Sequence, residues 1–203
     1  MTDHNLTNLV YKSRPVPLAD GLRVVRSTIH GYGVVTTRAF AAGELVCVGD
    51  GVLYREDDEF DDTYALILDG PTGETVLWDL VDQTRWFNHS CAPNTEVRSR
   101  WDDAARELRA WWVALRDIAP GEEITYDYGF VAEVAEPCAC GAATCRGVIV
   151  EDEPAQIARL PDQLRALLRR GASGGASVTL TSPIVAPSST LASSSDAGGR
   201  LTT

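Results

Sequence analysis

The sequence predicts a mostly β domain of the β-rich α+β class, and three observations lead to this prediction. Short valine-rich runs recur at intervals of roughly 10 residues, as the strands of small sheets do. Turns that contain glycine or proline, such as residues 41–43 and 119–122, separate these runs. Helical patterns are scarce before residue 150.

The expected strands are short, and most of them come in pairs around a turn. The glycine-punctuated residues 30–33 separate the first pair, and residues 69–73 separate another. Asp102 and Asp103 mark the turn of a hairpin, in whose first arm apolar or small residues alternate with charged ones. The acidic run 56–62 is expected to be an exposed loop or insert. The strands are expected at residues 22–27, 33–37, 44–48, 64–68, 75–80, 94–101, 107–115 and 123–126.

Two short helices are expected after the strands, at residues 155–160 and 161–170. Pro161 can open the second helix at its first position, and leucines at helical spacing give that helix an apolar side. Residues 171–203 have no aromatic side chain and consist mostly of small and polar residues. Such a stretch cannot bury enough apolar surface to offset its ordering entropy, so it is expected to be disordered.

The composition of the 203-residue chain narrows the class of protein. A hydrophobic content of 44% is normal for a globular domain, and no apolar run approaches the roughly 20 residues of a membrane helix. Residues 1–9 lack the pattern of a signal peptide, which favours a cytoplasmic protein. The net charge of −11 argues against a nucleic-acid-binding surface and favours cationic partners.

Three cysteines, Cys138, Cys140 and Cys145, lie within eight residues of one another. In a chain without a secretion signal, such a cluster favours metal ligands over disulfides. Structural Zn²⁺ sites take four ligands in a tetrahedron, and Cys91 is the best candidate for the fourth. The alternative is a cluster of free thiols or an adventitious disulfide. Cys47 lies in an expected strand and is interpreted as an inert, buried side chain.

Five motifs follow one another along residues 21–149, and together they are highly specific. They are Ser27-x2-His30-Gly31-Tyr32-Gly33-Val34, Ala42-Gly43-Glu44, Arg85-x2-Asn88-His89-Ser90-Cys91-x-Pro93-Asn94, Ile118-x-Pro120-Gly121-Glu122-Glu123-Ile124-Thr125-Tyr126-Asp127-Tyr128 and Cys138-x-Cys140-x4-Cys145-x-Gly147. In this order and spacing, they resemble the SET-domain protein lysine methyltransferases that carry a post-SET zinc segment.

The resemblance implies a SET fold of short strands in small sheets. In that fold the Asn88-His89 segment and the Tyr126–Tyr128 segment cross in a knot-like arrangement. It implies a SET domain at 21–130, a post-SET zinc segment at 131–150 and C-terminal helices at 151–170. An N-terminal segment, 1–20, precedes them and the tail, 171–203, follows.

The resemblance also implies the chemistry. S-adenosylmethionine is expected on one side of the domain, and a substrate lysine in a narrow channel on the other. One structural Zn²⁺ is implied at Cys91, Cys138, Cys140 and Cys145. The partner is expected to be a basic protein or peptide, with no nucleic acid and no membrane involved.

Two tyrosines are the implied catalytic residues. Tyr128 matches the family's catalytic tyrosine, whose hydroxyl orients the methyl group and the attacking nitrogen. With an ordinary pKa near 10, this hydroxyl is a poor base at neutral pH, so its role is expected to be electrostatic and orienting. Tyr126 matches the position that governs how many methyl groups fit, and simple packing of the channel wall is the alternative reading.

The cofactor contacts are also carried over by resemblance. Backbone groups of the glycine loop are expected at the methionine end, where a missing Cβ permits close approach. The Asn-His pair is expected to hold the amino group and the adenosine. The implied cofactor-binding residues are Gly31, Tyr32, Gly33, Tyr64, Arg85, Asn88, His89 and Tyr128.

One departure from the family pattern concerns the acceptor channel. Many members carry a channel tyrosine where this chain has Gly49. The channel is therefore either wider, or filled by Tyr54 or another group. This leaves two alternatives to lysine methylation: a SET-like binding module without turnover, and methylation of an amine that is not in a protein. The acidic run 56–62 is either a docking surface for a basic peptide or a solvated loop.

Overall fold

The computed structural model describes residues 19–55, 58–104 and 107–169. These residues form small sheets with few helices, which confirms the predicted β-rich class. The predicted disordered tail and nearly all of the N-terminal segment lie outside the described residues.

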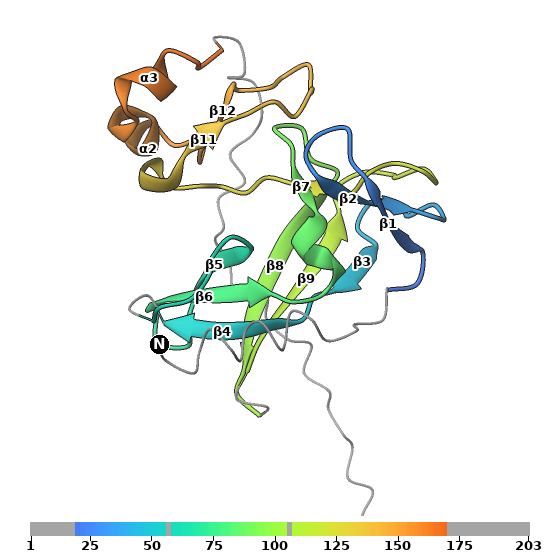
Figure 1. The fold of residues 1–203 in the computed structure, drawn as a ribbon. Coiled ribbons are helices and arrows are strands. Elements are labelled where there is room, and N and C mark those ends of the chain that lie inside the picture. Colours follow the sequence, from blue (N-terminus) through green and yellow to red (C-terminus); the bar gives the residue numbers. More distant parts are fainter. Residues whose placement is uncertain (1–18, 56–57, 105–106, 170–203) are drawn as a thin grey trace, which may run out of the picture.

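Two antiparallel units form one half of the β structure (Figure 1). β1 (Leu22–Arg26) pairs with β2 (Tyr32–Thr36) around the glycine turn. β3 (Leu45–Val48), β9 (Glu107–Ala114) and β8 (Thr95–Asp102) form a three-stranded sheet in that order. Each of these strands lies within a few residues of its predicted position.

A second three-stranded sheet has the order β4 (Gly51–Arg55), β6 (Thr75–Leu80) and β5 (Ala65–Asp69). The sequence predicted β5 and β6 but not β4, because Gly49-Asp50-Gly51 has the composition of a turn. The chain does turn there, and β4 starts at the second glycine.

The acidic loop between β4 and β5 contains no regular element in its described part, 58–64, as predicted.

Two very short strands join distant parts of the sequence. β7 (Asn88–His89) pairs in parallel with β10 (Thr125–Tyr126), so Asn88 lies opposite Thr125 and His89 opposite Tyr126. A single 3-10 turn, Gln83–Trp86, leads into β7, and the Asp82 carboxylate caps it by accepting the Thr84 N–H. This pairing brings the two predicted functional segments together.

Residues 131–169, the C-terminal segment, contain a small hairpin and two short helices. β11 (Glu136–Pro137) pairs with β12 (Val148–Ile149), and α2 (Pro154–Arg159) and α3 (Asp162–Arg165) follow. The predicted helix 161–170 is therefore too long. Pro161 precedes α3 as its N-cap, and after Arg165 the backbone changes to hydrogen bonds three residues back, as from the Leu167 N–H to the Leu164 carbonyl, so the helix stops there.

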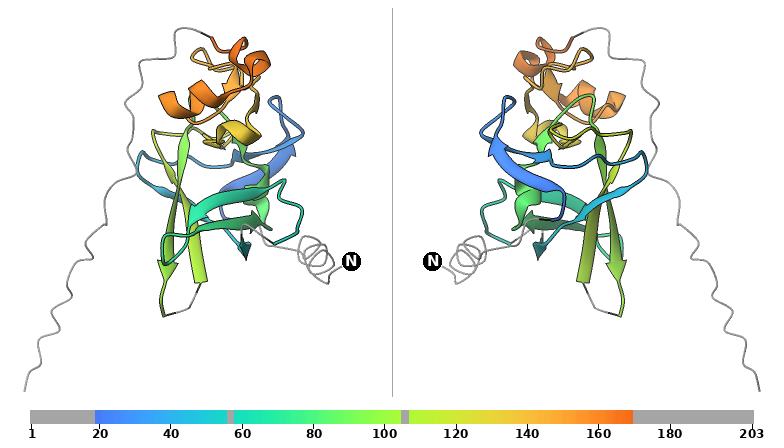
Figure 2. Two further views of the ribbon diagram at one scale, coloured as in Figure 1. Left: turned by 90° about the vertical axis from the view of Figure 1, so that its left-hand side faces the viewer. Right: turned by 90° about the vertical axis from the view of Figure 1, so that its right-hand side faces the viewer.

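Each region has its own apolar core. The main core lies among the strands and includes Phe40, Phe87 and Trp112. The C-terminal segment has a smaller core built on Val148, Val150 and Leu160. Figure 2 shows the C-terminal helices at one end of the molecule and the β8–β9 hairpin extending toward the other. In the described part of the chain, no helix is long and apolar enough to cross a membrane.

Candidate functional site

The pairing of β7 with β10 forms the centre of the candidate site. The Ser90 N–H donates to the Tyr126 carbonyl at 3.1 Å, which continues the contact beyond the paired residues. The side chain of Asn94 also bridges the two segments, because its Nδ2 donates to the Glu123 carbonyl and its Oδ1 accepts from the Thr125 N–H. The Asn-His and Tyr segments are therefore held side by side, as the sequence predicted.

Tyr128 lies in the first residues after β10. Its hydroxyl donates to the Phe87 carbonyl at 2.9 Å, and its ring lies 4.9 Å from the Tyr126 ring, centroid to centroid. Burial raises the pKa of Tyr128 to about 12 and raises the pKa of Tyr126 well above its ordinary value. Both hydroxyls are therefore protonated at neutral pH, and Tyr128 is a hydrogen-bonding group rather than a base.

The glycine loop between β1 and β2 is fixed by two side chains from other segments. Asn88 Nδ2 lies within hydrogen-bonding distance of the His30 and Tyr32 carbonyls and of Glu123 Oε1, at 3.2, 2.9 and 2.7 Å. A Cβ on Gly33 would lie 2.3 Å from Glu123 Oε1, so only glycine fits there. Gly31 has a φ of +49°, which also favours glycine.

Glu123 is a site residue that the sequence analysis did not single out. Its carboxylate accepts from Ser27 Oγ at 2.8 Å as well as from Asn88. Its position within a recognised motif was visible in the sequence. No pattern in a single sequence indicates that this carboxylate, rather than that of Glu122, turns inward.

A cluster of aromatic rings and arginines lies beside the glycine loop. The Arg85 guanidinium lies 4.3 Å from the Tyr64 ring centroid and 5.8 Å from that of Trp86. Tyr32 lies 6.3 Å from Trp86, ring to ring. The structure therefore brings together three residues that the sequence analysis had assigned to the cofactor: Tyr32, Tyr64 and Arg85. Trp86, which had not been assigned, lies between them.

Gly49 has no space for a side chain. A Cβ there would lie 2.7 Å from Trp112 Cζ3 and 3.3 Å from Trp78 Cη2. Tyr54 stacks on Phe60 instead, with ring centroids 3.9 Å apart. Of the sequence-based alternatives, the structure therefore favours filling by another group, the Trp112 indole, over a wider channel.

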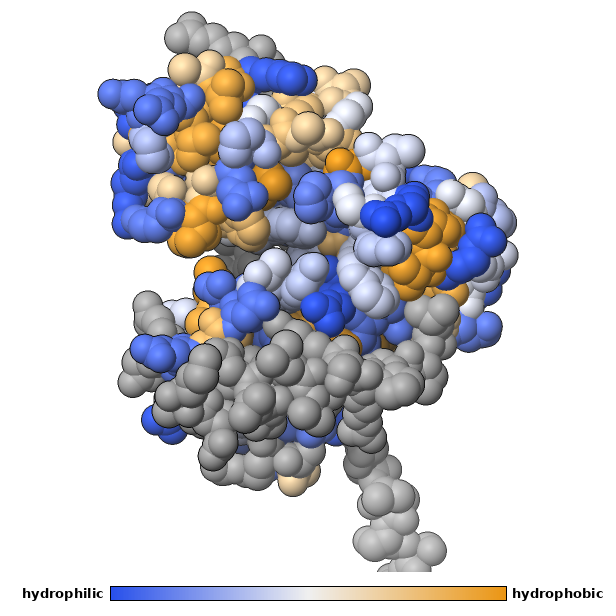
Figure 3. All heavy atoms as spheres, viewed as in Figure 1, coloured by the Kyte–Doolittle hydropathy of each residue, from blue (hydrophilic) through white to orange (hydrophobic). Residues whose placement is uncertain are grey.

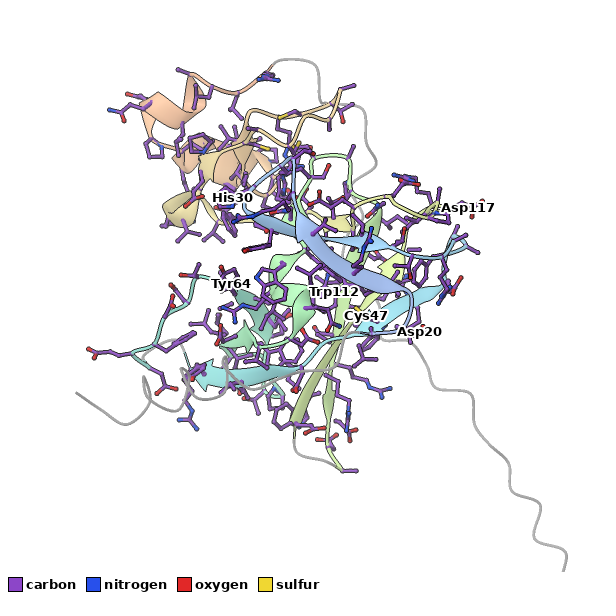
Figure 4. All side chains as sticks on the ribbon, turned by 45° about the vertical axis from the view of Figure 1, so that its right-hand side comes forward. Asp20, His30, Cys47, Tyr64, Trp112 and Asp117 are labelled. Carbon is purple, nitrogen blue, oxygen red and sulfur yellow. The ribbon has the colours of Figure 1, made fainter. Side chains whose placement is uncertain are left out.

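Trp112, whose indole fills the space beside Gly49, also contacts one of the site tyrosines. It is fully buried, and its indole makes edge-on contacts with Phe87 and Tyr126 at 5.4 and 5.8 Å. Figure 4 shows Tyr64 and Trp112 toward the centre of the molecule and His30 nearer the C-terminal segment.

A group of metal-ligating side chains lies on the other side of the Asn-His segment. Ligand atoms of His89, Cys91, Cys138 and Cys140 all lie within 4.8 Å of one another. The sulfurs of Cys91 and Cys138 are 3.7 Å apart. This is close to the roughly 3.8 Å edge of a tetrahedron with Zn–S bonds of about 2.3 Å.

Cys145 lies next to this group rather than within it. Its sulfur is 3.7 Å from the Cys138 carbonyl oxygen, and its thiol is among the groups that lower the pKa of Cys140. The structure therefore brings together three of the four predicted zinc ligands, places the fourth beside them and adds His89.

Of the three clustered sulfurs, only that of Cys140 is favoured as a thiolate without a metal, because burial raises the pKa of Cys91 to about 11 and raises that of Cys138 well above its ordinary value. The Cys91 N–H donates to Cys140 Sγ and the Arg146 N–H donates to Cys91 Sγ, both at 3.4 Å. Burial raises the pKa of Cys140, but backbone N–H groups of Cys91 and Ala142 outweigh it and lower that pKa to about 7. A thiolate donor set with N–H support fits Zn²⁺.

The hydrogen-bond network assigns the tautomer of His89. The Tyr128 N–H donates to His89 Nδ1 at 3.2 Å, so the proton of the neutral ring lies on Nε2. Nε2 is 3.3 Å from Cys91 Sγ, to which it can therefore donate. Burial lowers the pKa of His89 to about 4, which keeps the ring neutral. On this tautomer His89 supports a thiolate and is not itself a metal ligand.

The surface is indented between the C-terminal segment and the β4–β6–β5 sheet (Figure 3). In Figure 1, β7, which pairs with β10 at the centre of the candidate site, lies between the C-terminal segment and the β4–β6–β5 sheet.

The small sheets, the paired β7 and β10 segments and the site between them define the SET class of domain. Residues 31–129 match the family described as SET domain. The chain therefore contains a SET domain over these residues.

Its curated relatives include histone-lysine methyltransferases. An H3 lysine-4-specific histone-lysine N-methyltransferase of Cryptococcus neoformans is 38% identical over 143 residues, which cover 62% of this chain and 9% of that protein. Human histone-lysine N-methyltransferase 2B is 36% identical over 141 residues, which cover 63% of this chain and 5% of that protein. The chain thus spans less than a tenth of the length of these two relatives.

A solved structure has the same fold. The crystal structure of KRYPTONITE in complex with mCHG DNA and SAH aligns with a TM-score of 0.53 and 32% identity, covering 63% of this chain and 28% of that one. A second KRYPTONITE structure, with mCHH DNA, an H3(1-15) peptide and SAH, aligns with a TM-score of 0.52.

Proposed function

We propose that this protein transfers a methyl group from S-adenosylmethionine to the side-chain amine of a lysine in a protein. One observation carries the proposal. The pairing of β7 with β10 places the Asn88-His89 segment against the Tyr126–Tyr128 segment, with a partly buried, protonated Tyr128 beside both. The named activities of the relatives and the SAH in the KRYPTONITE structures support it.

The donor is proposed to lie between the glycine loop and the aromatic cluster. Asn88 Nδ2 is directed at protein acceptors, so its amide oxygen is the atom offered to the donor's amino group. Backbone groups of Gly31, Tyr32 and Gly33 line the same loop. The Tyr64 and Arg85 pair provides a flat, cationic wall, which suits a nucleoside base and a carboxylate.

The reaction is a direct displacement. The lysine nitrogen, in its neutral form, forms a bond to the methyl carbon as the bond from carbon to the sulfonium breaks, and the thioether leaves. The protein contributes alignment and exclusion of water. The Tyr128 hydroxyl orients the methyl group and the nitrogen, and it abstracts no proton because its pKa is about 12. The lysine loses its proton to solvent, assisted by the positive sulfonium.

The substrate is proposed to be a basic protein segment, such as a histone tail. The relatives act on histones by name, one KRYPTONITE structure holds an H3 peptide, and the chain carries a net charge of −11. Absence of direct nucleic-acid binding stays a prediction from that charge, since the KRYPTONITE structures also contain DNA. A cytoplasmic location likewise stays a prediction.

The zinc ligands are proposed to be Cys91, Cys138, Cys140 and Cys145. Zinc would close a tetrahedron of sulfurs and hold the C-terminal segment to the Asn-His segment, with no part in methyl transfer itself. The tautomer of His89 disfavours the alternative set in which its Nε2 replaces Cys145. In Co²⁺-loaded protein, the absorption spectrum should show four thiolates, change in Cys145→Ser and stay that of four thiolates in His89→Gln.

Incubation with labelled S-adenosylmethionine and a panel of basic proteins tests the activity. We expect label on lysine residues, and one equivalent of S-adenosylhomocysteine bound in calorimetry. Binding of a peptide and S-adenosylhomocysteine without any transfer would replace the proposal by a non-catalytic module. Transfer to a small amine but to no protein would replace the substrate.

A further inference from the structure

We propose that Asp127 and Arg146 form a latch through which the zinc segment positions Tyr128. The proposal rests on the proposed function, because the position of Tyr128 matters for methyl transfer. It concerns two residues that the sequence analysis did not assign to the site. Through the latch, the thiolate cluster would set the position of Tyr128 in the active centre, in addition to holding the C-terminal segment in place.

The latch itself is a two-pronged ion pair. Arg146 Nη1 lies 2.6 Å from Asp127 Oδ2, and Nη2 lies 2.8 Å from Oδ1. The Arg146 side chain is 11% exposed and that of Asp127 is 34% exposed. Such a planar, bidentate and mostly buried pair fixes both the distance and the orientation of its partners. By contrast, the Arg109–Glu107 pair is about half exposed on both sides.

One end of the latch belongs to the thiolate cluster. Arg146 stands directly between Cys145 and Gly147, and its N–H donates to Cys91 Sγ at 3.4 Å. Its carbonyl accepts the Arg169 N–H at 2.9 Å, which ties it to the chain four residues beyond α3 as well. Binding of a metal by these cysteines would therefore fix the backbone from which the guanidinium extends.

The other end of the latch belongs to the active centre. Asp127 lies between Tyr126 and Tyr128, and its Oδ1 accepts the Gly129 N–H at 3.2 Å. The carboxylate therefore shapes the turn that carries Tyr128. Without the guanidinium it would be a half-buried charge lacking its main partner, and the turn would be expected to rearrange.

A second connection runs in parallel through His89. Its Nδ1 accepts the Tyr128 N–H, and its Nε2 lies 3.3 Å from Cys91 Sγ. Nδ1 is also 3.4 Å from Asp127 Oδ1, so the ring lies between the thiolate and the latch. The backbone of Tyr128 is thus connected to the cluster through two side chains, neither of which would itself touch the reacting atoms.

Two sites connected in this way should affect each other's affinity. If zinc orders the segment and the latch transmits that order to Tyr128, zinc should tighten cofactor binding, and the cofactor should tighten zinc binding by the same factor. The latch predicts that this coupling is lost when the ion pair is broken, even while zinc stays bound.

The test measures S-adenosylhomocysteine affinity by calorimetry, with and without zinc, in wild-type protein and in Arg146→Gln. We expect zinc to tighten binding at least tenfold in wild-type protein and less than about threefold in Arg146→Gln, which should still bind one zinc per chain. Asp127→Asn should behave like Arg146→Gln, and Arg146→Lys should be intermediate because it keeps the charge without the fork. Arg109→Gln, which removes a surface ion pair of the β8–β9 hairpin, is the matched control and should retain the tenfold effect.

A second readout does not depend on the cofactor. Hydrogen exchange of residues 126–129 should accelerate on zinc removal in wild-type protein, and should already be fast in zinc-loaded Arg146→Gln. The latch would be overturned if zinc tightened S-adenosylhomocysteine binding equally in wild-type protein and Arg146→Gln. It would also be overturned if hydrogen exchange at residues 126–129 changed neither with zinc nor with the mutation. If wild-type protein bound no S-adenosylhomocysteine while exchange followed the predicted pattern, the proposed function would fail and the latch would stand.

Discussion

The strand core and the C-terminal segment keep their shapes by different means. The strands bury a large cluster of aromatic and aliphatic side chains, with Trp112, Phe40 and Phe87 among the most deeply buried. The C-terminal segment buries a small one, with two short helices that expose most of their residues. A region this small is not expected to order itself by apolar burial alone, and we propose that its cysteines and the ion pair to Asp127 supply the rest.

This difference matters for function because the candidate site lies between the two regions. The core supplies Asn88, Tyr126 and Tyr128, and it should keep its fold under conditions that disorder the segment. The segment supplies the thiolates and Arg146, which act on the site through Cys91, His89 and Asp127. Catalysis should therefore be lost in two distinguishable ways: by removing a group of the core, or by releasing the segment.

The largest expected effect comes from the core. Tyr128→Phe removes the hydroxyl proposed to orient the methyl group, so turnover should fall roughly 100- to 1000-fold. Affinity for S-adenosylhomocysteine should change less than about threefold. Steady-state kinetics with calorimetry checks both values. Tyr54→Phe, which removes the hydroxyl of a tyrosine outside the site, is the control; an equal loss in both variants would contradict an orienting role.

The second largest effect is expected when the C-terminal segment loses its zinc. Cys138→Ser should abolish zinc binding, which by analogy with zinc-finger peptides contributes about 10–16 kcal/mol to ordering. Hydrogen exchange should then become fast throughout residues 131–169, while amides of β8 and β9 remain protected. Cys47→Ala is the control, since Cys47 lies in the strand core away from the cluster. If both regions unfolded together, the strand core would not be stable independently of the segment.

A smaller effect tests the packing of the core near the tyrosines. Gly49→Tyr must displace Trp112 or Trp78 and should destabilise the protein by about 1–3 kcal/mol. Val48→Tyr, at the neighbouring exposed position, should stay within about 0.5 kcal/mol. If Trp112 fills the space, adding Trp112→Ile to Gly49→Tyr should cost less than the two single effects combined. Urea unfolding of the four proteins measures this coupling, and strict additivity would contradict the account of Gly49.

The smallest effect is expected in how kcat/KM depends on pH. The reacting lysine must be neutral, so kcat/KM should rise about tenfold per pH unit below the lysine pKa, whose ordinary value is about 10.4. Burial raises the pKa of Tyr128 to about 12, so its hydroxyl stays protonated across this range. The profile should therefore keep rising without a decline up to about pH 10. A fall in rate near pH 9 that is absent in Tyr128→Phe would show that the tyrosine ionises and that the assignment of its role is wrong.

Much of the fold was predictable because strand patterns and glycine turns are local signals. Seven of the eight expected strands correspond to full strands of three or more residues, and 123–126 contains the short β10. β4 was missed because its flanking glycines have the composition of a turn. The helix at 161–170 was predicted too long: the backbone leaves the helix after Arg165, and the Arg169 N–H then donates to the carbonyl of Arg146, which is distant in sequence.

The site was predictable to the extent that its residues lie in recognisable motifs. Asn88, Tyr128 and the cysteines could be found in this way, and their assigned roles stay predictions. Glu123, Asp127 and Arg146 lie within the same motifs, but their importance depends on partners that only the fold brings near. Trp112 fills the space at Gly49 from a strand more than 60 residues away, and no local pattern in the sequence indicates such a replacement.

Mass spectrometry of lysine-bearing basic peptides, incubated with S-adenosylmethionine and zinc-loaded protein, tests the central claim most directly. Wild-type protein should add methyl groups to a lysine, and none should be added when that lysine is replaced by arginine. Tyr128→Phe should leave the peptides essentially unmodified while still binding S-adenosylhomocysteine. Wild-type protein that binds S-adenosylhomocysteine and a peptide but leaves every lysine unmethylated would contradict the claim.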